Sequence, residues 1–146
     1  MNLSKDIKIT VVEAAAAAAQ TELVTDVLDM SGYEGVMFIA LLGDVDATSA
    51  LTLTVKGNTA NSLTVPAPVT QKATTLFTAD ATSADSKALV VDLYKPALRY
   101  VFANLTRTTA NAIVGGIIAI QYKAGLKPTA NDASVIASAL GLGVAA

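Results

Sequence analysis

The sequence predicts an all-β protein, a jelly roll or β-sandwich of about eight short strands followed by a C-terminal arm. Short segments rich in Val, Ile, Leu and Thr recur along the chain, and Gly, Asn and Pro separate them. No long amphipathic helical pattern interrupts the series. A chain of 146 residues with 53% hydrophobic residues is enough for one core. We therefore expect residues 1–125 to form one domain and residues 126–146 to form an arm or a short helix.

The first expected strand begins at Lys5, where Ile7, Ile9 and Val11 alternate with polar residues. Six consecutive alanines follow, at residues 14–19. Alanine is the best helix former, but six residues are far fewer than the roughly 12 to 15 that an isolated helix needs. Because the run lies between two strand patterns, we expect it to be a connection with at most one helical turn.

Two further strands are predicted at residues 23–30 and 36–42, joined by a turn that contains Gly32 and Gly35. The second of these strands is apolar throughout, which is typical of a strand buried on both faces. Residues 51–56 alternate strictly between apolar and polar, which indicates a half-buried strand.

The remaining strands are predicted at residues 74–78, 88–94, 98–107 and 112–122. Residues 59–71 contain two prolines, so we expect a loop with at most one short edge strand there. Gly115 and Gly116 fall inside the last strand, where glycine typically marks a bulge or a bend. Residues 132–140 are predicted either to form a short helix stopped by Gly141 or to order only against another subunit.

The composition excludes several classes of function. Ten Lys and Arg are balanced by twelve Asp and Glu and form no basic stripe, so we expect no nucleic-acid partner. The chain has no Cys and no His, which removes disulfides, thiolate zinc sites and the commonest general base. It has neither a signal-peptide pattern nor an apolar run of about 20 residues, so we expect a soluble protein made in a cytoplasm without a membrane partner.

No pattern of residues selects an active site or a metal site. Asp44 and Asp46 have the spacing of two calcium ligands, but the other ligands and the glycine of an EF-hand loop are missing. Asp80 and Asp85 lie in a second polar loop with no stronger pattern. No nucleophile elbow, phosphate-binding loop or dinucleotide fingerprint is present, and nothing selects a pair of catalytic carboxylates. We expect no metal, no cofactor and no enzymatic activity.

The segment at residues 92–107 mixes the cations Lys95, Arg99 and Arg107 with aromatic residues. One interpretation is that the aromatic side chains belong to the core and the cations are solvated. The other is a subunit or partner interface, where Arg and Tyr are enriched. In the second case Arg99 pairs with a carboxylate of a neighbouring molecule.

Two stretches, DMSGYEGVMFIALLG at residues 29–43 and residues 90–128, resemble the decoration (capsid cement) proteins of tailed-phage heads. The shared features are an Asp-Met-x-Gly-Tyr-x-Gly-Val turn into an apolar strand, a Lys-Pro followed by an Arg-Tyr pair, an Arg followed by Thr and Asn-Ala, and a Tyr before a final Lys-Pro. The resemblance implies a structural protein, a homotrimer, that binds the major capsid protein on the outer surface of the expanded head and stabilises it. It also implies synthesis in the host cytoplasm and a final location in the virion.

The residues expected at the capsid or subunit interface are Tyr33, Lys95, Arg99, Arg107 and Lys127. Tyr33 and Lys127 belong to the motifs that carry the resemblance, and the three others belong to the cationic segment. The alternative function is a carbohydrate-binding jelly-roll module of a host-attachment structure.

Overall fold

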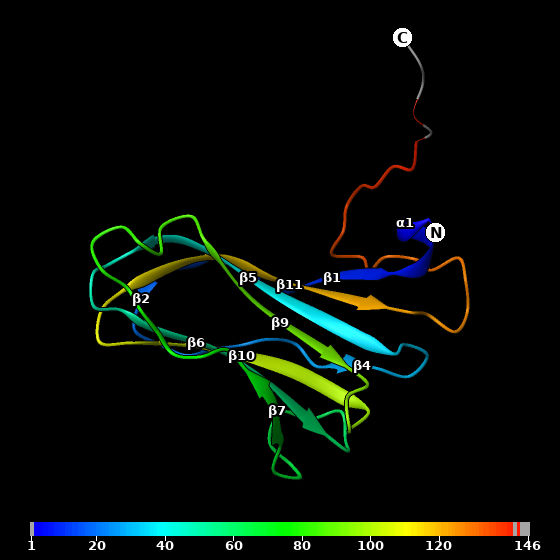
Figure 1. The fold of residues 1–146 in the computed structure, drawn as a ribbon. Helices are drawn as coiled ribbons and strands as arrows, with labels where there is room; N and C mark the ends of the chain where they lie inside the picture. Colours follow the sequence, from blue (N-terminus) through cyan, green and yellow to red (C-terminus); the bar gives the residue numbers. More distant parts are fainter. Residues whose placement is uncertain (1, 142, 144–146) are drawn as a thin grey trace.

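The computed structural model describes residues 2–141 and 143 and consists of two antiparallel β-sheets packed face to face (Figure 1). The elements are α1 (Leu3–Asp6), β1 (Lys8–Glu13), β2 (Ala16–Ala19), β3 (Leu23–Val24), β4 (Leu28–Asp29), β5 (Gly35–Val45), β6 (Ala50–Asn58), β7 (Val69–Ala73), β8 (Phe77–Thr78), β9 (Ala88–Tyr94), β10 (Tyr100–Thr108) and β11 (Ala112–Tyr122). The predicted β-sandwich is confirmed.

Sheet A has the order β1-β11-β5-β9, and β2 also pairs with β11. Sheet B has the order β3-β10-β6-β7, and β4 and β8 pair with β10 and β6. In three cases, β1 with β2, β3 with β4, and β7 with β8, two short strands lie along the same neighbour. The eleven strands of the described chain therefore fill eight positions, which explains why the sequence pattern indicates about eight.

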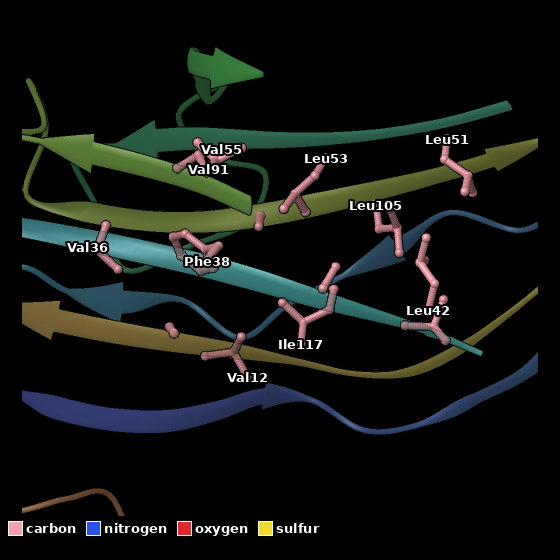
Figure 2. Packing of buried hydrophobic residues seen from close by; sticks show 14 of the residues in the cluster. Val12, Val36, Phe38, Leu42, Leu51, Leu53, Val55, Val91, Leu105 and Ile117 are labelled. Carbon is pink, nitrogen blue, oxygen red and sulfur yellow. The ribbon is translucent and has the colours of Figure 1, made fainter. Parts of the chain in front are cut away.

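The core lies between the two sheets, as Figure 2 shows. Alternate side chains of each long strand point inward, as the period of a β-strand requires. Sheet A contributes Val12, Val36, Phe38, Leu42, Val91 and Ile117, and sheet B contributes Leu51, Leu53, Val55 and Leu105.

The apolar strand at residues 36–42 became the centre of β5, but it is buried on one face only. Val36 and Phe38 are fully buried, whereas Met37 and Ile39 are half-buried and Leu41 is 43% exposed. The prediction of burial on both faces is wrong for this chain alone, because among the described residues only α1 lies against the outer face of sheet A, and only at one end.

The alanine run is a strand, and the prediction of a connection or helical turn is wrong. Ala16 and Ala19 of β2 lie opposite Val114 and Ala112 of β11. Strand β1 already pairs with β11, so the chain continues along the same neighbour after a short irregular step. Backbone hydrogen bonds to β11 outweigh the helix preference of alanine, which is a weak determinant when tertiary contacts compete.

The predicted glycine bulge is confirmed in β11. The register with β5 shifts between Val114 and Gly116. Gly116 has φ +132, and a Cβ atom there would lie 3.2 Å from the carbonyl oxygen of Glu13. Only glycine accommodates both the positive φ and this close approach.

The predicted strand at residues 23–30 is broken into β3 and β4. The edge strand expected in the loop at residues 59–71 is β7, which starts near the C-terminal end of that loop. The strand predicted at residues 74–78 is shortened to β8. The four-residue helix α1 was not indicated by the sequence pattern.

The chain after β11 contains no helix within its described residues, so the predicted short helix at residues 132–140 is wrong. Residues 129–134 run beside β1, where the backbone N–H of Asp132 donates to the carbonyl oxygen of Ile9 at 3.1 Å. Residues 135–141 extend away from the domain as an arm (Figure 1). Within the described residues, no helical segment has the length and hydrophobicity that crossing a bilayer takes.

Candidate interface at one end of the sandwich

Three loops meet at one end of the sandwich, on the right in Figure 1. They are residues 30–34 between β4 and β5, residues 95–99 between β9 and β10, and residues 123–127 after β11. They line two shallow hollows that share Tyr33 and Glu34.

Four of the five expected interface residues lie at this end. Tyr33, Lys95 and Arg99 line the first hollow, and Lys127 lines the second together with Lys123. We call these five residues the end surface. Their positions follow from sheet pairing, because β5, β9 and β11 are neighbours in sheet A and the loops emerge where these strands begin or end.

Backbone hydrogen bonds join the three loops to one another. The N–H of Met30 donates to the carbonyl oxygen of Arg99 at 2.8 Å, and the N–H of Lys95 donates to the carbonyl oxygen of Glu34 at 2.7 Å. The N–H of Gly125 donates to the carbonyl oxygen of Gly32 at 2.9 Å. The loop at residues 30–34 is therefore bonded to both other loops, which fixes their mutual positions.

Arg99 is paired within the chain. Its Nε and Nη2 atoms each donate to a carboxylate oxygen of Asp29 at 2.9 Å, and both side chains are exposed. These hydrogen bonds from Arg99 hold the pKa of Asp29 below its usual value of 3.8. An exposed ion pair of this kind adds little stability, so a partner's carboxylate can replace Asp29 at small cost.

Two lysines of the end surface also have acidic neighbours. Lys127 Nζ lies 2.8 Å from Asp6 Oδ1, and Lys123 Nζ lies 3.7 Å from Glu34 Oε2. Lys95 forms no ion pair with any residue that the structure describes. Its ammonium group lies 5.4 Å from the centre of the Tyr94 ring.

A pair of stacked tyrosines supports the lysines. The rings of Tyr94 and Tyr122 are 6.5 Å apart and nearly parallel, at 7°. The ammonium group of Lys123 lies 5.1 Å from the Tyr94 ring, within the range of a cation–π contact. Lys95 and Lys123 directly follow these tyrosines, and both have left-handed φ angles of 52 and 51. This backbone conformation is uncommon outside glycine and occurs here at the ends of β9 and β11, the two strands that flank β5 in sheet A.

The hydroxyl of Tyr122 donates to Asp92 Oδ1 at 2.5 Å. Burial raises the pKa of Tyr122 far above its usual 10.0, and the hydrogen bond to Asp92 raises it further. Tyr122 therefore acts as a neutral hydrogen-bond donor and not as a proton acceptor.

Arg107 lies elsewhere, and its prediction as an interface residue is wrong. It is 1% exposed and points into the sandwich at the end opposite the end surface. Its guanidinium group donates to the carbonyl oxygens of Ala17, Thr21 and Ala112 and to the hydroxyl of Thr21, at 2.6 to 3.0 Å. Burial lowers its pKa. With its donors directed at backbone oxygens inside the fold, Arg107 is not accessible to a partner.

The aspartates considered as metal ligands do not cluster. Among the described residues, no three or more Asp, Glu, His or Cys side chains are arranged to hold a metal ion. Asp85 instead accepts a hydrogen bond from the backbone N–H of Val45 at 2.9 Å.

The sequence prediction missed Lys123, Glu34 and the tyrosine stack. The signal that identifies them is a repeated Tyr-Lys dipeptide, at residues 94–95 and 122–123, at the ends of two predicted strands. The register then places Gly35 of β5 between the two tyrosines, opposite Tyr94 on one side and Tyr122 on the other.

Comparisons with known proteins identify no family. No family model matches the chain, and no curated protein matches it. A solved structure described as "Bacillus endospore appendages form a novel family of disulfide-linked pili" matches with a TM-score of 0.47 and 14% identity, over 86% of this chain and 95% of that chain. At this score and identity the likeness says nothing about function.

Proposed function

We propose that this chain is a structural protein of a tailed-phage virion, a decoration protein that binds the outer surface of the expanded head and stabilises it. It acts as a homotrimer on the major capsid protein and has no enzymatic role. The sequence resemblance suggests this function, and the chemistry of the end surface supports it.

The supporting observation is the meeting of four expected interface residues, Tyr33, Lys95, Arg99 and Lys127, at one end of a rigid sandwich. They come from three loops that are separate in sequence but joined by backbone hydrogen bonds. A surface whose geometry is fixed before binding loses less conformational entropy when a partner docks. This is the property that a protein needs to recognise a repeated site on a lattice.

The charges of the end surface suit a capsid surface that carries carboxylates. Lys95 forms no ion pair with a described residue, and the pairs of Arg99 and Lys123 are solvent-exposed. Each such contact is weak, but a trimer presents three end surfaces at once. Linked contacts add through effective concentration, so weak single contacts give firm attachment.

Binding of this kind stabilises the head by mass action. A ligand that binds the assembled shell and not its dissociated subunits shifts the equilibrium towards the shell, by about 2.7 kcal/mol per site at a hundredfold excess over Kd.

The test uses undecorated expanded heads and the purified protein. We expect co-sedimentation at saturating stoichiometry and a higher melting temperature of the heads in calorimetry. The variant Lys95→Glu should bind weakly, whereas Lys87→Glu should bind normally because Lys87 is an exposed lysine at the opposite end of β9. Absence of co-sedimentation together with an unchanged head melting temperature contradicts the proposal.

The same material tests the carbohydrate-binding alternative. A glycan screen that finds clear sugar binding, with no affinity for heads, would favour it. The structure gives it no specific support, because the ring of Tyr94 already has two lysine ammonium groups and the Tyr122 ring close to it.

A further inference from the structure

The outer face of sheet A is apolar. Paired residues of neighbouring strands point to the same side, so the register defines rows across this face. One row consists of Val11, Ile118, Ile39 and Val90. One adjacent row consists of Ile9, Ile120 and Met37 and ends at Asp92. The row on the other side contains Leu41, which lies opposite Ala88. Val90 is 47% exposed, so this face is in contact with water in the single chain.

The outer face of sheet B is the internal comparison. The outward residues of β6 there are Thr52, Thr54 and Lys56, and Thr52 lies opposite Thr106. A solvated antiparallel sheet normally alternates apolar inward and polar outward residues in this way. Along β6 the outer face of sheet B is therefore of the solvated type, whereas the central row on the outer face of sheet A is apolar across all four strands.

The outer face of sheet A also deepens at one end. There, α1 and sheet A form a groove of about 440 Å³, lined on its apolar side by Leu3, Ile7, Met37 and Ile120. An apolar side chain of a partner fits such a groove better than water does.

The arm is the second unpartnered apolar feature. No charged residue follows Asp132 in the sequence. Ile136 is 99% exposed and Leu140 is exposed as well, so neither is buried by its own domain. A turn at Asp132 separates the arm from β1: the N–H groups of Ser134 and Val135 donate to its carboxylate and its carbonyl oxygen, each at 3.0 Å.

The arm is separated from the groove of its own chain by α1. Ser4 and Lys5 of α1 face the arm, whereas Leu3 and the following Ile7 line the groove. Within one molecule, the two apolar features therefore remain apart.

We infer that the arm of one copy, residues 135–141, lies across the outer face of sheet A of a second copy. Each chain then gives one arm and accepts one. The arm has sufficient reach, because seven extended residues span about 23 Å and four strands are only about 15 Å wide between the outer two. An arm-to-face contact is heterologous and closes into a ring when the rotation between copies allows it, which is how a trimer forms.

Cysteine cross-linking tests this contact without background, because the chain has no cysteine. Two differently tagged chains, one with Ile136→Cys and one with Val90→Cys, are mixed, dissociated, reassociated and oxidised. We expect a covalent heterodimer between the two tags. The matched pair, Ile136→Cys with Thr54→Cys on the outer face of sheet B, should give none.

Two results would overturn the inference. The first is that the mixture gives no heterodimer, whereas a single chain that carries both Ile136→Cys and Val90→Cys forms an internal disulfide. This result would place the arm on its own domain. The other is a full-length chain that light scattering finds monomeric at tens of micromolar.

A second measurement does not depend on disulfide formation. The variants Ile136→Ser and Val90→Lys should each lower the molar mass of the assembly, whereas Ser138→Ala and Thr54→Lys should leave it unchanged. Circular dichroism checks that each variant keeps its β-sheet spectrum. Neither experiment involves phage heads, and Lys95→Glu should leave the cross-link intact, so the arm contact can fail while head binding holds.

Discussion

Replacing Arg107 by alanine should destabilise the fold by about 3–5 kcal/mol, because several acceptors inside the fold would lose their hydrogen-bond donor. The guanidinium group makes four hydrogen bonds, three of them to carbonyl oxygens of the backbone. Each buried acceptor left without a donor costs about 1–3 kcal/mol, and part of this is recovered where the structure relaxes or water enters. Since a domain has only about 5–15 kcal/mol of stability, the loss is a large fraction of the total.

Urea unfolding followed by circular dichroism measures this difference, and Arg99→Ala is the matched control. Arg99 is exposed and paired with one carboxylate, so its removal should destabilise the fold far less than the removal of Arg107 does. Arg107→Lys should fall between the two, because an ammonium group keeps the charge but not the planar array of donors. A loss for Arg107→Ala no larger than that for Arg99→Ala would refute the reasoning.

Three further predictions concern the end surface and residues next to it. The pKa of Tyr122 is raised above 10.0 in the fold, so its neutral form adds stability below about pH 10, and this stability is lost as the pH rises further. We expect the free energy of unfolding of Tyr122→Phe, measured by urea titration, to fall less at alkaline pH. The pKa of Asp29 is lowered, so its contribution holds above pH 3.8 and is lost at lower pH; Arg99→Leu should return the pKa towards 3.8 in an NMR titration. Gly35→Ala should cost about 1–3 kcal/mol, because its Cβ would overlap the Tyr122 ring.

Each of these has a contrary outcome. An unchanged alkaline profile in Tyr122→Phe would mean that the hydroxyl is not held neutral by its surroundings. An Asp29 pKa that does not move in Arg99→Leu would mean that the ion pair is not populated in solution. A neutral Gly35→Ala would mean that the tyrosine stack is loosely held.

The strand pattern is predictable from the sequence because it depends on local alternation. Residues 51–56 show the period of two, and β6 follows it. The conformation of the alanine run is not predictable from local alternation. Alanine has no side-chain preference strong enough to oppose pairing, so its conformation depends on β11, which is about 100 residues away in the sequence.

The candidate site is predictable only in part, because local motifs identify its loops but not how the loops come together. The motifs identify the loops that carry Tyr33, Lys95, Arg99 and Lys127, but their meeting depends on the order of strands in sheet A. The burial of Arg107 is predictable from the alternation of residues along its strand. Arg107 lies an even number of residues from Val101 and Leu105 in β10, both of which point into the core, so its side chain points inward as well.

The three interrupted strand pairs also determine how copies of this chain associate. Of the four outer positions of the two sheets, three are occupied by β1 with β2, β3 with β4, and β7 with β8, and only β9 is continuous. A broken edge offers no long row of free N–H and C=O groups for a further strand. Residues 129–134 also cover part of β1, since Ser134 Oγ accepts from the N–H of Val11. Open-ended growth into fibrils by strand addition is thus disfavoured even when many copies are crowded together.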